Sequence, residues 1–197
     1  MAWGKAGSTT LASAGDDLDV TFTASKFNQI LVSQYATGGN VSAAFTMNND
    51  GGSLYAQRLS ENSGAEFSNG SQTSVYNYMS SAGTRDRLLV QNFVSISGEE
   101  KLGISHLVTN GTIGAGTAPQ RQELVYKYVP ADLTDAITRV DEYNASGGSF
   151  DTDSNITVLG SDITPATVAP KVQDGAIFYE TDTNKSYVLS SSVWTEL

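Results

Sequence analysis

Residues 17–59, DLDVTFTASKFNQILVSQYATGGNVSAAFTMNNDGGSLYAQRL, carry four short apolar runs with the two-residue period of β-strands. Leu18, Val20 and Phe22 alternate with polar residues, and the next run is rich in β-branched and aromatic side chains. The last two runs flank NNDGG at 48–52, and Asn, Asp and Gly tolerate the positive φ of a tight turn. The stretch therefore predicts β-strands, with a hairpin turn at 48–52.

The chain repeats this pattern of short runs and turns up to residue 162. After a loop rich in Ser, Asn and Gly at 60–72, we expect strands at 75–79, 88–96, 102–108, 124–129, 137–143 and 156–159. Windows of about 12 residues hold no convincing 3.6-residue apolar stripe, so helix should be minor. Strands at this spacing are typical of an antiparallel β-sandwich or barrel. The fold class is therefore all-β.

The composition fits this class and narrows the function. Charged residues make up 16% of the 197 residues, whereas Gly, Ser, Thr and Asn are abundant. The net charge of −10, with 11 scattered basic residues, excludes a phosphate-neutralising stripe, so we expect no nucleic-acid partner. The chain has no cysteine, which excludes disulfides and thiolate chemistry. No apolar run approaches the ~20 residues of a membrane span and no signal-peptide pattern is evident, so we expect cytoplasmic synthesis without membrane insertion.

Residues 175–197, GAIFYETDTNKSYVLSSSVWTEL, predict a separate three-stranded β-meander. Apolar residues gather at 177–179, 187–189 and 193–194, with polar turn residues between them. A sheet of about 20 residues is marginal in water unless an apolar face is covered. We therefore expect this segment to dock on its own domain or on a neighbouring subunit, and assembly is the first functional hypothesis.

A linker separates this segment from the preceding strands. Residues 161–174 carry two of the four prolines, Pro165 and Pro170, among small polar residues. The predicted organisation is a β-sandwich at 1–160, a Pro-containing linker at 161–174 and an assembly or docking module at 175–197.

Residues that could carry catalysis or bind a metal are few. His106, the one histidine, shares a predicted strand face with Leu102 and Ile104, where a core or interface role is favoured over catalysis. GTIGAG at 111–116 looks like a phosphate-cradling loop, but it leads to a strand rather than a helix. DTDSN at 151–155 alternates oxygen ligands as calcium loops do; a turn capped by its own side chains is favoured, and calcium stays an alternative. We expect no enzymatic activity and no cofactor, and assign no catalytic or metal-binding residue.

Two pairs of tyrosines, Tyr76 with Tyr78 and Tyr126 with Tyr128, each share one face of a predicted strand. Exposed aromatic pairs stack on sugar rings or on partner chains, whereas buried pairs pack in a sandwich core. The sequence leaves both alternatives open, so these four residues are candidate contacts to a glycan or a partner.

The terminal segment has an apolar strand, an ETDTNK turn at 180–185, a Tyr-Val strand and a Trp near its end, in that order. In this order it resembles the C-terminal β-hairpin module of structural proteins of tailed bacteriophages. The matching positions are Gly175, Ile177, Phe178, Tyr179, Asp182, Thr183, Tyr187, Val188 and Trp194. LSSS at 189–192 replaces the usual Trp-Asn-Gly-like turn. Residues 8–160, with an opening segment at 9–22 and a closing strand at 150–160, resemble a phage-type jelly-roll β-sandwich.

The resemblance implies a non-enzymatic virion component that is assembled in the host cytoplasm and displayed outside the particle. The leading hypothesis is an oligomeric capsid-decorating protein, a trimer being one option, that contacts other virion proteins such as the capsid shell. A tail-fibre or receptor-binding tip that grips host-surface glycans is the alternative, and a carbohydrate-binding module of a cellular protein is a second. Under the leading hypothesis the interface residues are Ile177, Phe178, Tyr179, Tyr187, Val188 and Trp194.

Overall fold

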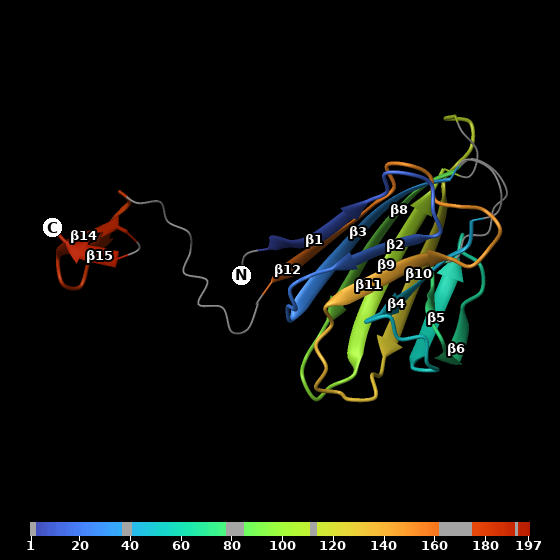
Figure 1. Ribbon diagram of the computed structural model, residues 1–197, viewed down its shortest axis with the longest axis horizontal. Helices are drawn as coiled ribbons and strands as arrows, with labels where there is room; N and C mark the ends of the chain where they lie inside the picture. The colour runs from blue at the N-terminus through green and yellow to red at the C-terminus, as the bar shows by residue number, and fades with distance from the viewer. Residues whose placement is uncertain (1–2, 37–40, 78–84, 111–113, 162–174, 192) are drawn as a thin grey trace. The chain divides into compact units, whose positions relative to one another are not determined.

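The computed structural model describes residues 3–36, 41–77, 85–110, 114–161, 175–191 and 193–197 (Figure 1). Over these residues the protein is all-β, with antiparallel pairing throughout and no helix, as the sequence predicts. Two compact units are present, Met1–Ile163 and Thr164–Leu197. Most of the predicted linker lies outside the described residues, and Ser161, which the prediction assigned to the linker, is the last residue of a strand.

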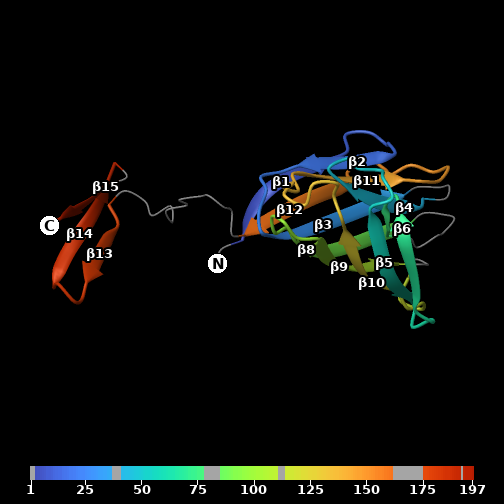
Figure 2. The ribbon, with the colours of Figure 1, turned by 90° about the horizontal axis from the view of Figure 1, so that it is seen from below.

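The first unit is a sandwich of two sheets. The larger sheet has the strand order β1 (Gly4–Thr10), β12 (Asn155–Ser161), β3 (Phe27–Ala36), β8 (Arg85–Val94), β9 (Lys101–Thr109), β10 (Gln120–Tyr128), β5 (Tyr55–Glu61) and β6 (Phe67–Gln72). The smaller sheet has the order β2 (Asp17–Thr21), β11 (Arg139–Asn144), β4 (Ala43–Met47) and β7 (Val75–Tyr76). Figure 2 shows the two sheets as layers, with β2, β11 and β4 stacked on one side of the larger sheet.

The chain crosses repeatedly between these layers. β2 and β4 of the smaller sheet alternate along the sequence with β1, β3 and β5 of the larger one, and β11 precedes β12. Within the larger sheet the hairpin-connected strands β8, β9 and β10 lie between β3 and β5, and β1 pairs with β12 from the far end of the unit. The expected antiparallel β-sandwich is the fold of this unit.

Apolar side chains from both layers form the core between the sheets. Phe45 of β4 meets Tyr126 of β10 edge to face, with ring centroids 5.1 Å apart. Tyr55 of β5 stacks on Tyr128 of β10 at 4.9 Å. In β2, Leu18 is buried between exposed Asp17 and half-buried Asp19, as its alternation predicts. The contact between Phe45 and Tyr126 joins the two layers, whereas Tyr55 and Tyr128 stack within the larger sheet.

The predicted hairpin at 48–52 is wrong. β4 and β5, which flank this turn, belong to different sheets, so NNDGG carries the chain from one layer to the other. Both asparagines take positive φ, as the turn chemistry requires. The Tyr55 hydroxyl accepts the Met47 amide at 2.9 Å and donates to the Asp50 carbonyl oxygen at 2.8 Å, which holds the crossing in place.

The prediction missed two edge strands of the larger sheet. β6 lies in the segment that was assigned to a loop at 60–72, and β1 precedes the first predicted strand. Their sequences, FSNGSQ and GKAGSTT, contain one large apolar residue between them, Phe67, which is exposed. Edge strands pair along one side only, and these two carry little apolar periodicity from which to predict a strand.

The second unit holds the predicted meander, built from β13 (Ile177–Glu180), β14 (Lys185–Ser190) and β15 (Val193–Glu196). β14 is the central strand and pairs antiparallel with both neighbours. Over the part of the chain that the structure describes, no helix has the length and apolar character needed to cross a membrane.

Candidate assembly surface

Short-range contacts fix the register of the meander. In the first turn, Asn184 has a φ of 55° and its Oδ1 accepts a hydrogen bond from the Tyr179 hydroxyl at 2.8 Å. Lys185 Nζ donates to Glu196 Oε2 across β14 and β15 at 2.8 Å, and this bond raises the pKa of the lysine. Because register and alternation are both set, each side chain belongs to one of two faces.

The first face of the meander carries an aromatic cluster of Phe178, Tyr187 and Trp194. The Phe178 ring centroid lies 6.1 Å from that of Tyr187 and 6.0 Å from that of Trp194. Phe178 and Trp194 nevertheless remain 49% and 42% exposed. Leu189, which pairs with Trp194, is the one buried side chain in the described part of the meander. The rings therefore touch one another without closing a core.

The second face is apolar as well. Ile177, Tyr179, Val188 and Val193 alternate with the aromatic cluster along the three strands. Ile177 is 69% exposed and Val193 is 62% exposed. A three-stranded sheet with two open apolar faces has more apolar surface than it can bury by itself, which makes it a candidate interaction surface.

The structure brings all six predicted interface residues into this one sheet but divides them between its faces. Phe178, Tyr187 and Trp194 lie on the first face, and the other three lie on the second. Sequence reasoning missed Val193, although its alternation with Trp194 could have identified it. The described charges of the meander are three carboxylates, on Glu180, Asp182 and Glu196, and the ammonium of Lys185.

A further apolar surface lies on the larger sheet, on the side that faces away from the smaller sheet. Along β9, Leu102 and Ile104 are about half exposed, whereas Gly103 between them and Ser105 after them are buried. Leu102 pairs directly with Val94 of β8, and Ile104 pairs with Val125 of β10. Paired residues of an antiparallel ladder share a face, so these aliphatic side chains form continuous rows across the sheet.

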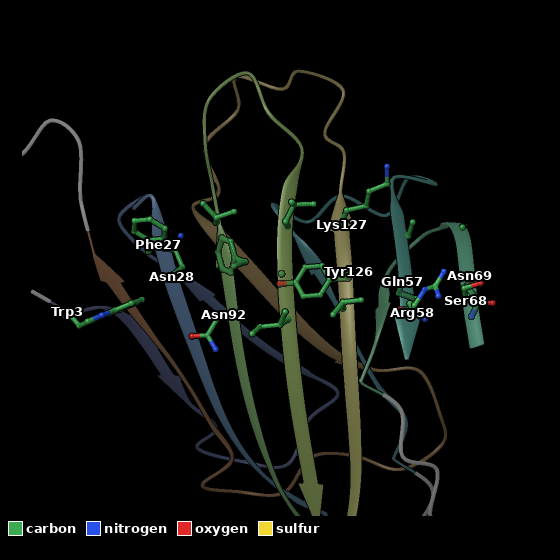
Figure 3. Close-up of a pocket in the computed structure, with 18 residues that line it drawn as sticks. Trp3, Phe27, Asn28, Gln57, Arg58, Ser68, Asn69, Asn92, Tyr126 and Lys127 are labelled. Atoms are coloured by element: carbon green, nitrogen blue, oxygen red, sulfur yellow. The ribbon is translucent and has the colours of Figure 1, made fainter. Parts of the chain in front are cut away.

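The side chains of these rows line the bottom of a groove of about 800 Å³ (Figure 3). Trp3 and Phe27 lie on one side of it, and Arg58 and Asn69 lie on the other. Sequence reasoning missed this groove, because alternation alone does not tell which face of a strand points inward.

His106 lies on the same outer face as Leu102 and Ile104, as predicted. Its side chain is exposed, so it is not a core histidine. Across the sheet it pairs with Val90 on one side and Glu123 on the other. The sequence predicted either a core role or an interface role for His106, and the interface role remains a prediction.

The four candidate tyrosines divide between surface and core. Tyr126 and Tyr128 are buried, so both pack in the core of the sandwich. They are not available to a glycan or a partner. The Tyr126 hydroxyl accepts a hydrogen bond from Gln91 Nε2 at 2.7 Å, and burial raises the pKa of Tyr126. Tyr76 is partly exposed on β7, and Tyr78 lies outside the described residues.

The structure supports no phosphate or metal site at the two loops that the sequence suggested, 111–116 and 151–155, within their described residues. Asp151 Oδ1 accepts a hydrogen bond from the Thr152 amide at 2.8 Å, which is the capped turn expected at 151–155. The loop at 111–116, part of which lies outside the described residues, connects the antiparallel pair β9 and β10. A pocket of about 600 Å³ on the smaller sheet contains Asp19 and Asp141, both of which bind the guanidinium of Arg139. Among the described residues, no group of three or more His, Cys, Asp or Glu could hold a metal ion.

A buried carboxyl group stands apart from both surfaces. Glu142 of β11 accepts hydrogen bonds from Gln34 Nε2 at 3.1 Å and from Asn77 Nδ2 at 3.1 Å. Burial raises the pKa of Glu142 to about 7, although the two amides and the nearby Arg87 guanidinium act in the opposite direction. The amide oxygens of Gln34 and Asn77 accept no hydrogen bond within the described structure. These two buried amide oxygens are therefore left without a donor.

Comparison with known proteins adds no relative, since no family model, curated protein or solved structure matches the chain. The two apolar surfaces are therefore the features on which a functional proposal rests.

Proposed function

We propose that this chain is a non-enzymatic structural protein on the outside of a tailed phage virion, where it decorates the capsid as an oligomer. The observation that carries the proposal is the meander, which exposes apolar side chains on both faces and buries only Leu189 among its described residues. The sandwich has a complete core of its own, so the meander is free to serve association rather than folding.

The size of the exposed surface supports association. Ile177, Phe178, Tyr179 and Trp194 are each between 42% and 69% exposed. Covering the exposed part of one such side chain contributes on the order of 1 kcal/mol. In a closed symmetric assembly each subunit both provides and receives a contact, so the gain recurs at every interface.

The virion assignment is supported by the resemblance of residues 175–197 to the terminal module of phage structural proteins. A jelly-roll-like sandwich that carries a detachable association module also suits a repeated component of a particle surface. The expected copy number is high, because a decorating protein follows the repeats of the shell beneath it.

Purified phage particles test the location. We expect mass spectrometry to find this chain in tens to hundreds of copies per particle and immunogold labelling to mark the heads. Labelling confined to tail tips would replace capsid decoration with the tail-fibre alternative, and absence of the chain from particles would reject the virion proposal.

Truncation tests the association itself. Removing residues 175–197 should leave the sandwich folded and convert the oligomer to a monomer in light scattering. Asp182→Asn is the matched control, because it changes an exposed turn residue of the same segment and should keep the oligomer. An oligomer of unchanged mass after truncation would contradict a role of the meander in assembly.

A further inference from the structure

The two faces of the meander differ in charge. Paired residues of an antiparallel ladder share a face, so the pairs Glu180 with Lys185 and Tyr187 with Glu196 place every charged side chain of the three strands on the first face. The first face therefore has two carboxylates and one ammonium beside its aromatic cluster. The strand side chains on the second face are all uncharged. They are Ile177, Tyr179, Ser186, Val188, Ser190, Val193 and Thr195.

These charges disfavour a contact between two first faces. Such a contact would bring together the two carboxylates and one ammonium of each copy, in a chain whose net charge is already −10. Like charges that oppose each other in an interface cost free energy, and interface cores are depleted in charged residues. The contact would also leave both second faces open, although Ile177 is 69% exposed and Val193 is 62% exposed. A first face against a second face opposes a charged surface to an uncharged one and covers both.

The size of the faces favours the use of both. The three strands are four to six residues long, which gives each face a width of about 14 Å and a length of about 17 Å. The resulting area of about 240 Å² is well below the ~800 Å² per partner of a standard interface. A copy that uses both faces has twice this area in contact, whereas a pair joined through first faces does not.

The polar groups of the two faces lie at the same end of the meander. On the first face, Glu180 pairs with Lys185 next to the turn at 181–184. On the second face, Tyr179 pairs with Ser186 at this same end. When two meanders stack with their strands in one direction, these hydroxyl groups of one copy lie over the charged groups of the other. Hydroxyl groups donate to carboxylates, which have lone pairs for several hydrogen bonds.

The next row of each face continues this match. On the first face the row contains Phe178, Tyr187 and Glu196, and on the second face it contains Ile177, Val188 and Thr195. In the same stack, two aromatic rings and a carboxylate therefore meet two aliphatic side chains and a hydroxyl group. The opposite strand direction would place the charged end of one copy over Val193 of the other.

We propose that the first face of the meander of one copy packs against the second face of the meander of the next copy, with the strands in the same direction. The proposal rests on association through the meander, as proposed above, and adds which faces meet. Such a contact is heterologous, since each partner contributes a different face. It closes into a ring or continues as a stack, according to the rotation between neighbours.

Two matched double variants of the full chain test the pairing of faces. Phe178→Ser with Trp194→Ser removes aromatic side chains of the first face, and Ile177→Ser with Val193→Ser removes aliphatic side chains of the second. All four side chains are between 42% and 69% exposed, so both variants should keep the strands of the meander. We expect each variant to have the monomer mass of 20.8 kDa in sedimentation velocity, because each lacks one side of every contact.

The other outcomes distinguish this inference from the proposed function. A second-face variant that keeps the wild-type mass would overturn the inference and leave association through the first face standing. A first-face variant that keeps this mass, beside a monomeric second-face variant, would show that second faces pair with each other and would overturn it as well. A monomeric wild type, or two variants that both keep the wild-type mass, would reject both proposals.

Disulfide trapping shows directly which faces meet, and it needs only single substitutions. The chain contains no cysteine, so an introduced cysteine reports its contacts without background. Glu196→Cys lies on the first face and Thr195→Cys lies on the second, in the rows that the proposed stack brings together. Mixed and oxidised, these two proteins should form a mixed disulfide several-fold faster than either protein forms a disulfide with itself.

Asp182→Cys, in the exposed turn of the same segment, is the control. Its mixture with Glu196→Cys should react several-fold more slowly than the mixture of the two face variants, and equal rates would contradict the proposed contact. Self-linking of Glu196→Cys that is as fast as the mixed reaction would show that two first faces meet. That result would overturn the inference and leave association through the meander, and hence the proposed function, standing.

Discussion

The buried carboxyl group of Glu142 makes the stability of the sandwich depend on pH. Its pKa in the folded state is about 7, against about 4.5 for an ordinary glutamate. Between these values the folded state holds a proton that the unfolded state has lost, so the free energy of unfolding falls as pH rises and levels off above pH 7. A difference of about 2.5 pH units corresponds to about 3 kcal/mol.

Glu142→Gln should abolish this dependence, because the glutamine side chain has the shape of the neutral acid and does not titrate. From pH 4.5 to pH 8, the difference in unfolding free energy between variant and wild type should move by about 3 kcal/mol in favour of the variant. Urea unfolding at several pH values measures it. A difference that stays constant, or that moves in favour of the wild type, would refute the reasoning. Glu123→Gln, an exposed carboxylate on β10, is the control and should change stability by less than about 0.5 kcal/mol.

Three further substitutions test the packing of the sandwich by thermal or urea unfolding. Gly103→Ala should destabilise by about 1–3 kcal/mol, since the new methyl group would overlap the buried Tyr126 ring; a stability within 0.5 kcal/mol of wild type would contradict this contact. Tyr128→Phe should cost about 1 kcal/mol by removing the bond from its hydroxyl to Asp50 Oδ2 at 3.1 Å, and an unchanged stability would count against that bond. Lys101→Met should cost more, about 2–4 kcal/mol, because the buried ammonium donates to the carbonyl oxygens of Ile96, Glu99 and Leu133; a stabilised variant would contradict that role.

The strand β9 shows how far its sequence predicts its structure. The alternation of Leu102, Ile104 and His106 correctly placed the three on one face. It could not show that this face points outward, because which face of a strand points to the core depends on the neighbouring strands. Tyr126 from β10 fills the space over Gly103, so this strand presents a small residue to the core. A buried Lys101 is tolerated on the same inward face because three backbone carbonyl groups accept its hydrogen bonds.

The fold of the meander, in contrast, could be predicted from its sequence. Its strands pair with their immediate neighbours along the chain, so local alternation and turn residues specify the whole sheet. The NNDGG turn at 48–52 shows the limit of such reasoning, since its two flanking strands belong to different layers and do not pair with each other. The groove joins residues from 3 to 127, and no local pattern brings such residues together.

The central claim is that the exposed aromatic face of the meander holds copies of this chain together. Sedimentation equilibrium of the wild type and of Phe178→Ser with Trp194→Ser tests it most directly, with melting of the sandwich as the check on folding. We expect the wild type to have a mass that is a multiple of 20.8 kDa, and the variant to have the monomer mass with an unchanged melting temperature of the sandwich. A wild type that is monomeric at micromolar concentration, or a variant that keeps the full oligomeric mass, would contradict the claim.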